Sequence, residues 1–258
     1  MWRNRFRLLS PTRKYCCQFS RNIVTAEQVK TFQDQGVICI RGVFGEWIKR
    51  LTKGIERNLA NPGKLSEWLK SENSETYYFN DLLNWQQIPE FKEFVFESPA
   101  AEIAGKLMDA QFTVFYHEHV FTKDPGTTST TPWHHDQSYY PVDGWKNYKY
   151  TKTYNEKVFE DIPDIDSHPD AYNLLSWDLK PGDCLAFHFR ILHGAKQSTD
   201  PDGRKVVAMR WLGEDATFAE RPWEPAPNYS GGLKPGDHFY KSESFPVVWR
   251  SEKANLVT

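Results

Sequence analysis

The sequence lacks several features that mark particular protein classes. It has no run of roughly 18 apolar residues, so no segment is predicted to cross a membrane as a helix. Cysteine is scarce: there are four, and none form a C-x-x-C pair, which argues against a thiolate zinc site. The 32 basic and 34 acidic residues leave a net charge of -2, which argues against binding nucleic acid through phosphate contacts.

Aromatic residues, by contrast, are plentiful. They make up 15% of the 258 residues and include ten tryptophans. Large rings suit β-rich folds and apolar pockets, although most of them serve ordinary core packing. The apolar content of 39% and the charged content of 26% are typical of a globular chain long enough for one domain with a substantial core.

Residues 1–24 differ in composition from the rest of the chain. They contain five arginines and one lysine, and the first acidic residue is Glu27. A basic, acid-poor, amphipathic segment is typical of a mitochondrial presequence; the alternative is a disordered basic tail on a cytoplasmic protein. We therefore expect a presequence over residues 1–24, a mitochondrial location, and a single domain over residues 25–258.

Helix signals come first along the chain, and strand signals follow. Apolar periodicity and capping residues predict helices over residues 25–35, 46–61 and 99–109. Apolar runs bounded by turn residues predict strands over residues 37–40, 112–121, 174–179, 184–192 and 206–212. This order is typical of a mainly β fold, a double-sheet jelly roll with a helical layer at its N-terminal end.

One pattern of side chains points to bound iron. A mononuclear Fe(II) oxygenase needs two imidazoles and one carboxylate on one side of the metal, with the other side open. His134 and Asp136 are spaced i, i+2, which on an extended strand directs both side chains to the same side. His193, which closes the predicted strand 184–192, is the candidate third ligand, and Gly194 after it allows close approach.

An arginine near this pattern can hold a carboxylate of a 2-oxoglutarate co-substrate. Arg204 lies just past His193 and can begin the next strand, and its planar fork matches a carboxylate at two points. Arg210 competes for this role, but it lies deeper in a predicted strand, where a buried arginine needs a partner. We prefer Arg204.

The motifs PWHHDQ (132–137), WDLKPGD (177–183), LHG (192–194) and GR (203–204) carry a family resemblance. With them, residues 25–250 resemble the phytanoyl-CoA dioxygenase family of Fe(II)- and 2-oxoglutarate-dependent oxygenases. The resemblance implies a cupin-like double-stranded β-helix in which His134, Asp136 and His193 bind Fe(II), Arg204 binds 2-oxoglutarate and His119 lines the co-substrate pocket. It also implies that O2 and 2-oxoglutarate are consumed, that a C–H bond is hydroxylated, and that succinate and CO2 are released.

The sequence departs from the family pattern after the H-x-D motif. Residues 141–145 lead almost directly into residues 149–152 and an acidic loop, where the family has further core strands. We therefore expect a barrel that lacks one or two core strands and has exposed edges. This favours, as an alternative function, a catalytically impaired binding or regulatory member of the family.

Other residues offer competing interpretations. His117 and His119 share one strand face and form a rival H-x-H metal pair, as in a cupin-like enzyme that also uses His193. We expect Lys123 to be a solvated turn residue, although it could assist with a carboxylate. The aromatic side chains that could wall a small-molecule or acyl substrate are Trp133, Tyr139, Tyr140 and Trp145. No pattern indicates an oligomeric state.

Overall fold

The computed structural model describes residues 23–71, 75–144, 162–197 and 200–252. The predicted presequence lies outside these residues except for its last two, Ile23 and Val24, which pack in a core cluster with Phe32. The predicted substrate-wall residue Trp145 also lies outside the described residues. Within the described part of the chain, no helix is long and apolar enough to span a membrane.

Helices cluster in the first half of the chain, as predicted. The α-helices are α1 (Ala26–Gln35), α2 (Ile48–Ala60), α3 (Pro89–Glu97) and α4 (Ala100–Met108). Four short 3-10 segments are η1 (Gly45–Trp47), η2 (Asp136–Ser138), η3 (Pro169–Ala171) and η4 (Phe239–Lys241).

Helix α1 begins and ends where its sequence signals predict. The Thr25 side chain accepts a hydrogen bond from the backbone N–H of Gln28, whose side chain accepts one from the backbone N–H of Thr25. Gly36 ends the helix in the left-handed conformation, with φ of 73°. The chain can therefore turn at once into β1, and the predicted boundaries are confirmed.

The largest sheet is built around the long strand β4. The described strands are β1 (Val37–Ile40), β2 (Glu67–Lys70), β3 (Tyr77–Leu82), β4 (Phe112–Lys123), β5 (Thr131–His134), β6 (Val142–Asp143), β7 (Cys184–Phe187), β8 (His193–Ala195), β9 (Arg204–Leu212), β10 (Thr217–Phe218) and β11 (Val247–Arg250). Strand β4 pairs antiparallel with β3, β9 and β11, and β2 adds to β3. We call these five strands the main sheet.

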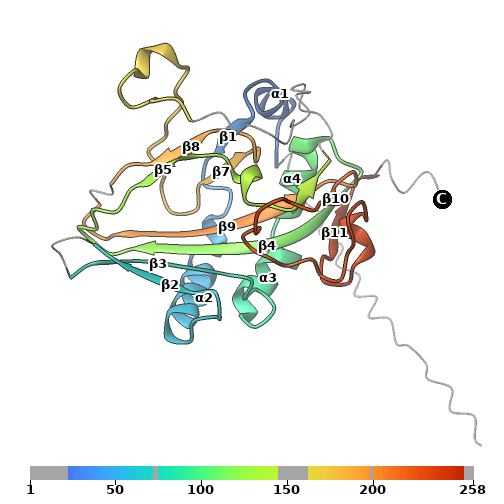
Figure 1. Ribbon diagram of the computed structural model, residues 1–258, viewed down its shortest axis with the longest axis horizontal. Helices are drawn as coiled ribbons and strands as arrows, with labels where there is room; N and C mark the ends of the chain where they lie inside the picture. The colour runs from blue at the N-terminus through green and yellow to red at the C-terminus, as the bar shows by residue number, and fades with distance from the viewer. Residues whose placement is uncertain (1–22, 72–74, 145–161, 198–199, 253–258) are drawn as a thin grey trace, which may run out of the picture.

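The two faces of the main sheet have different partners. Helices α2 and α3 lie against one face, and the β5–β8 pair lies on the other side (Figure 1). The helix-facing side of the sheet buries Phe115 and Val120 against Phe91 and Val95 of α3 and Ile55 of α2. The β4–β9 pairing has an irregularity between Phe115 and His117, beyond which side chains alternate regularly. His117, His119 and Lys123 therefore lie on the opposite face from Val120, on the side of β5 and β8.

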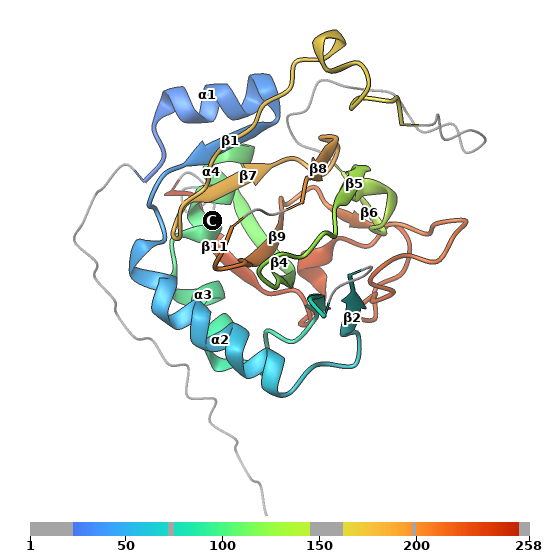
Figure 2. The ribbon, with the colours of Figure 1, turned by 90° about the vertical axis from the view of Figure 1, so that its left-hand side faces the viewer.

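The described strands do not close a barrel. The pairs β1–β7, β5–β8 and β6–β10 are separate from one another and from the main sheet. Figure 2 shows β7, the β5–β8 pair and β9 arranged around a common centre, and no ladder joins β7 or the β5–β8 pair to β9. The expected open barrel is therefore confirmed for the described residues.

Two strand predictions were wrong. Residues 174–179 form no strand, and Leu174, Leu175 and Leu179 are exposed, because no described strand pairs with this segment. The predicted strand 184–192 ends at Phe187 instead, and a turn separates it from β8. Helix α3 and the β2–β3 hairpin were not predicted at all.

Glu118 is a buried acid on the helix-facing side of β4, opposite to the side chain of His117, as alternation predicts. Its side chain is fully buried, and Oε1 accepts a hydrogen bond from the backbone N–H of Asn84. Burial raises the pKa of Glu118 to about 7, and the nearby Asp81 carboxylate adds to the rise. The folded chain therefore binds this proton more tightly than the unfolded chain does.

The raised pKa of Glu118 makes folding stability fall as pH increases. Its unfolded pKa lies near 4.5, so its contribution is complete below that pH and is lost as pH rises through the folded value of about 7. The loss is on the order of 3 kcal/mol. Urea unfolding should therefore show that the free energy of unfolding declines less between pH 4.5 and pH 8 in Glu118→Gln than in the unmodified chain. The control Glu97→Gln changes an exposed glutamate and should show the same decline as the unmodified chain. The same decline in all three proteins would contradict the raised pKa of Glu118.

Candidate metal centre

Three separate segments bring the predicted ligands together. His134 is the last residue of β5, His193 is the first residue of β8, and the antiparallel register places them directly opposite each other. Two local predictions are corrected: Asp136 opens η2 instead of continuing the strand, and His193 begins a strand instead of closing one. The extended backbone of His135 (φ -125°, ψ 142°) still keeps Asp136 on the side of His134.

Gly194 permits this close pairing, as the sequence predicted. A Cβ atom added there would lie 3.0 Å from the carbonyl oxygen of Thr131 and 3.4 Å from the backbone nitrogen of Trp133. Those contacts are tight, so a larger residue would push β8 away from β5. The distance between the two histidines therefore depends on the absence of a side chain at this position.

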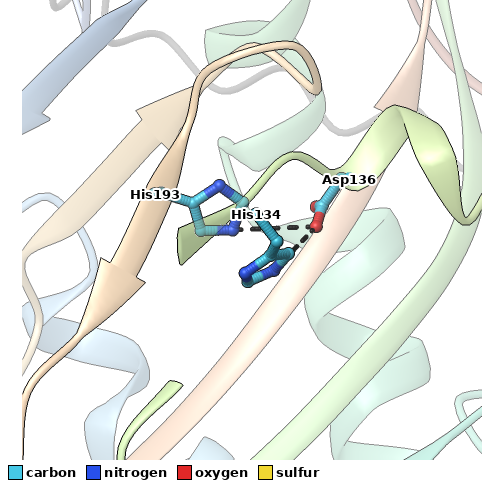
Figure 3. Close-up of side chains that lie close together, drawn as sticks. All are labelled: His134, Asp136 and His193. Carbon is cyan, nitrogen blue, oxygen red and sulfur yellow. Dashed lines mark ion pairs between the residues drawn. The ribbon is translucent and has the colours of Figure 1, made fainter. Parts of the chain in front are cut away.

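The three side chains converge on one point (Figure 3). The Oδ1 atom of Asp136 lies 3.6 Å from Nε2 of His134 and 3.7 Å from Nε2 of His193. One ligand atom from each residue falls within 4.8 Å of the others. Atoms bound at right angles to one ion, at distances of about 2.1 Å, lie about 3 Å apart, so small rotations would complete a three-ligand metal site. Two imidazoles and one carboxylate fit Fe(II).

Backbone carbonyls fix which ring nitrogens face the metal position. Nδ1 of His134 lies 2.8 Å from the carbonyl oxygen of Pro132, and Nδ1 of His193 lies 2.9 Å from that of Ile191. A carbonyl oxygen can only accept, so each Nδ1 carries the proton and donates it. The Nε2 lone pair of each ring is therefore directed at the shared point, as metal-binding histidines require.

Asp136 is held as a buried anion. Burial raises its pKa, but the contact with His134 and the charges of Arg210 and His193 outweigh burial and bring the pKa well below its ordinary value. Its Oδ2 atom lies 3.1 Å from Nη2 of Arg210, in an ion pair that is poorly aligned for a hydrogen bond. The carboxylate is therefore ready to bind a cation without first losing a proton.

A second arginine connects η2 to the turn before β8. The Nε atom of Arg190 donates to Oε1 of Gln137 at 2.8 Å. The backbone N–H of Gln137 also donates to the carbonyl oxygen of Phe189 at 3.2 Å. Gln137 is the residue after Asp136, and Arg190 lies three residues before His193. These bonds therefore connect the segment that carries Asp136 to the segment that leads into His193.

Strands β4 and β9 form the wall facing the three ligands. Their register pairs His117 with Arg210, His119 with Ala208, and Lys123 with Arg204. Alternation places these residues on the same face of the sheet. The prediction that Arg204 begins the strand after His193 is confirmed, and the partner expected for a buried Arg210 is Asp136.

Two cations lie at the end of this wall. Lys123 was wrongly expected to be a solvated turn residue: it is the last residue of β4, is 6% exposed, and donates from Nζ to the carbonyl oxygen of Ser129 at 2.7 Å. Burial and the charge of Arg204 lower the pKa of Lys123. No carboxylate among the described residues is paired with either cation, so the two favour an anion between them.

The rival H-x-H pair does not join the metal cluster. Among the described residues the cluster consists of His134, Asp136 and His193 alone. Nδ1 of His117 lies 3.0 Å from the carbonyl oxygen of Glu118, and Nε2 of His119 lies 3.4 Å from Oδ1 of Asn80. Burial first, and Arg210 second, lower the pKa of both rings to about 3, so both are neutral.

The predicted substrate-wall aromatics divide into two kinds. Tyr139 is 45% exposed, and its ring centroid lies 5.8 Å from that of His134. Tyr140 instead packs in the core against Tyr116 and Phe189, so it cannot line a substrate site. Tyr140 accepts a hydrogen bond from Arg210, a contact that no sequence pattern indicates.

Comparison with known families agrees with this site. The model of the family described as "Phytanoyl-CoA dioxygenase (PhyH)" matches residues 32–149 and 143–206, which is more than half of the chain. The chain therefore belongs to the phytanoyl-CoA dioxygenase family. A sequence search of curated proteins finds no match.

Solved structures show the same fold at low sequence identity. The non-heme alpha ketoglutarate dependent carbocyclase SnoK from nogalamycin biosynthesis aligns with a TM-score of 0.69 and 20% identity, over 88% of this chain and 97% of SnoK. The epimerase SnoN in complex with Fe3+, alpha ketoglutarate and nogalamycin RO aligns with a TM-score of 0.64 and 14% identity, over 86% and 97%. EctD from S. alaskensis with 2-oxoglutarate and 5-hydroxyectoine aligns with a TM-score of 0.58 and 14% identity, over 83% of this chain and 82% of EctD. The chain thus has the cupin-like jelly-roll fold, with its barrel open.

Metal binding should depend on the cluster residues and not on their neighbours. Calorimetric titration of the chain with Co(II) should show one site that disappears in His134→Ala and in His193→Ala, because each removes one of three ligands. His135→Ala removes the adjacent imidazole, which is outside the cluster, and should bind Co(II) as tightly as the unmodified chain. Retained stoichiometric binding in His193→Ala would exclude this metal centre.

Proposed function

We propose that the chain is an Fe(II)- and 2-oxoglutarate-dependent dioxygenase that hydroxylates a small molecule or an acyl derivative. The observation that carries the proposal is the convergence of two Nε2 atoms and one carboxylate oxygen, with both Nδ1 protons held by carbonyl groups. Membership of the phytanoyl-CoA dioxygenase family and the iron and 2-oxoglutarate named for similar structures support it.

Each residue of the site has a distinct part in this function. His134, Asp136 and His193 would hold Fe(II), which with O2 and 2-oxoglutarate supplies the oxidation of a C–H bond to C–OH, yielding succinate and CO2. Arg204 would bind the distal carboxylate of 2-oxoglutarate through its planar fork, with Lys123 beside it. His119, neutral and on the same face between Arg204 and Arg210, would line the co-substrate pocket. Tyr139, which is exposed and packs beside the His134 ring, would contact the substrate.

The role of Arg204 can be separated from metal binding. Arg204→Ala should weaken 2-oxoglutarate binding to the Co(II)-loaded chain by roughly 10- to 100-fold, because a two-point, charge-assisted contact is lost. Lys205→Ala removes a neighbouring positive charge on the exposed side of β9 and should leave the affinity unchanged. Calorimetry measures both. Equal weakening in the two variants would show a general charge effect and would contradict a specific anchor.

Turnover tests the reaction itself. The Fe(II)-loaded chain should convert 2-oxoglutarate to succinate, slowly without substrate and faster with the correct one. The incomplete barrel supports a second candidate, a binding or regulatory member of the family that retains the metal but not the reaction. Stoichiometric iron with a 2-oxoglutarate chelate but without succinate formation would favour that candidate.

The proposed location is mitochondrial, and it rests on the basic, acid-poor composition of residues 1–24. A full-length chain with a C-terminal tag should fractionate with mitochondria and be shortened at its N-terminus. Replacement of the arginines among residues 1–24 by glutamine should abolish import. A full-length, cytoplasmic product from the unmodified chain would exclude the proposal.

A further inference from the structure

Arg210 contacts the metal-binding carboxylate and the core at the same time. Its Nη2 atom lies 3.1 Å from Oδ2 of Asp136, and its Nε donates to Oη of Tyr140 at 3.0 Å. Its side chain is only 10% exposed, so the guanidinium has little freedom to turn toward solvent. Asp136 and Tyr140 lie one helical turn apart at η2, so one planar group holds both ends of this segment.

Tyr140 is a rigid support for this contact. Its ring centroid lies 5.3 Å from that of His117 and 5.3 Å from that of Phe189, and 5% of the residue is exposed. A tyrosine packed in this way holds its hydroxyl in a fixed position. The hydroxyl then holds Nε of the Arg210 guanidinium, so Nη2 of the same planar group meets Asp136 in one orientation.

Because of the ion pair with Arg210, the two carboxylate oxygens of Asp136 have different partners. Oδ2 faces Arg210, whereas Oδ1 faces Nε2 of both His134 and His193, at 3.6 and 3.7 Å. A carboxylate without such a partner can rotate and bind a cation through both oxygens. In a site that must leave coordination positions open for co-substrate and O2, a second carboxylate oxygen would occupy one of them.

Arg210 also joins parts of the fold that no strand ladder joins. Among the described strands, the β5–β8 pair that carries both histidines shares no ladder with the main sheet. Arg210 projects from β9 of the main sheet toward η2, which directly follows β5. The ion pair therefore positions the ligand-bearing strands relative to the wall that carries Lys123 and Arg204.

We propose that Arg210 is a positioning residue that presents Asp136 to the metal through Oδ1 alone and keeps the remaining coordination positions available. The inference rests on the proposed metal centre and adds a role for a residue that does not touch the metal itself. It assigns the Arg210–Tyr140 pair to the organisation of the site instead of to general stability.

Calorimetric titration with Co(II) tests this on the full chain. Arg210→Met should weaken Co(II) binding by about 10- to 100-fold, as loss of a partner of a metal ligand does. At saturating Co(II), the same variant should also bind 2-oxoglutarate more weakly, because the released Oδ2 competes for a coordination position. A purely structural role would not change this second affinity. Arg210→Lys should resemble Arg210→Met, because one ammonium group cannot hold Tyr140 and Asp136 in one plane.

The matched control breaks another arginine–carboxylate pair far from the ligands. Arg57 donates from Nε and Nη2 to the carboxylate of the buried Glu90, at 3.0 Å each. Arg57→Met should lower the unfolding temperature and leave the affinity for Co(II) unchanged. If it weakens Co(II) binding as much as Arg210→Met does, the effect is one of general stability and the proposal is overturned.

The remaining outcomes separate this inference from the proposed function. If Arg210→Met does not fold, Arg210→Lys and Tyr140→Phe replace it, and unchanged Co(II) and 2-oxoglutarate affinities in both would overturn the inference. If the unmodified chain binds Co(II) and 2-oxoglutarate but Arg210→Met binds them equally well, only the role of Arg210 is wrong. If the unmodified chain binds no Co(II), both the metal centre and this inference fall.

Discussion

The antiparallel pairing of β5 with β8 is the constraint on which the site depends. It sets His134 opposite His193 and brings together two residues that are far apart in the sequence. Gly194 lets the strands approach closely, and the carbonyl groups of Pro132 and Ile191 orient the rings. These features come from the backbone of the two strands, so the fold itself brings the two imidazoles together.

Charge organises the rest of the site. Asp136 and Arg210 are both buried, and an isolated charge in such a place would be costly. Each charge compensates the other, and the cost of burying both leaves little net gain in stability from the pair. The second arginine, Arg190, donates a hydrogen bond to the uncharged side chain of Gln137, the residue after Asp136. The segment that carries the carboxylate ligand is thereby fixed by interactions on two sides.

The three residues that cluster at the candidate metal centre could be predicted from the sequence because their signals are local. The H-x-D spacing survives a change from strand to 3-10 turn, since His135 remains extended, and a histidine followed by glycine marked the distal ligand. The strand expected at residues 174–179 failed because a strand also needs a neighbour, which an apolar run does not reveal. The burial of Lys123 and the contact between Tyr140 and Arg210 depend on strand register across β4 and β9. No spacing along the chain encodes that register.

The Lys123–Arg204 ladder pair has a thermodynamic consequence. Two like charges at opposite positions of neighbouring strands repel each other, and burial of Lys123 adds to that cost. The two adjacent cations thus carry a local electrostatic penalty, which a bound dianion would offset. A ligand that binds only the folded chain raises its free energy of unfolding, so such a dianion would also act as a counter-ion that stabilises the domain. The concentration of such a dianion would then change the fraction of the chain that is folded.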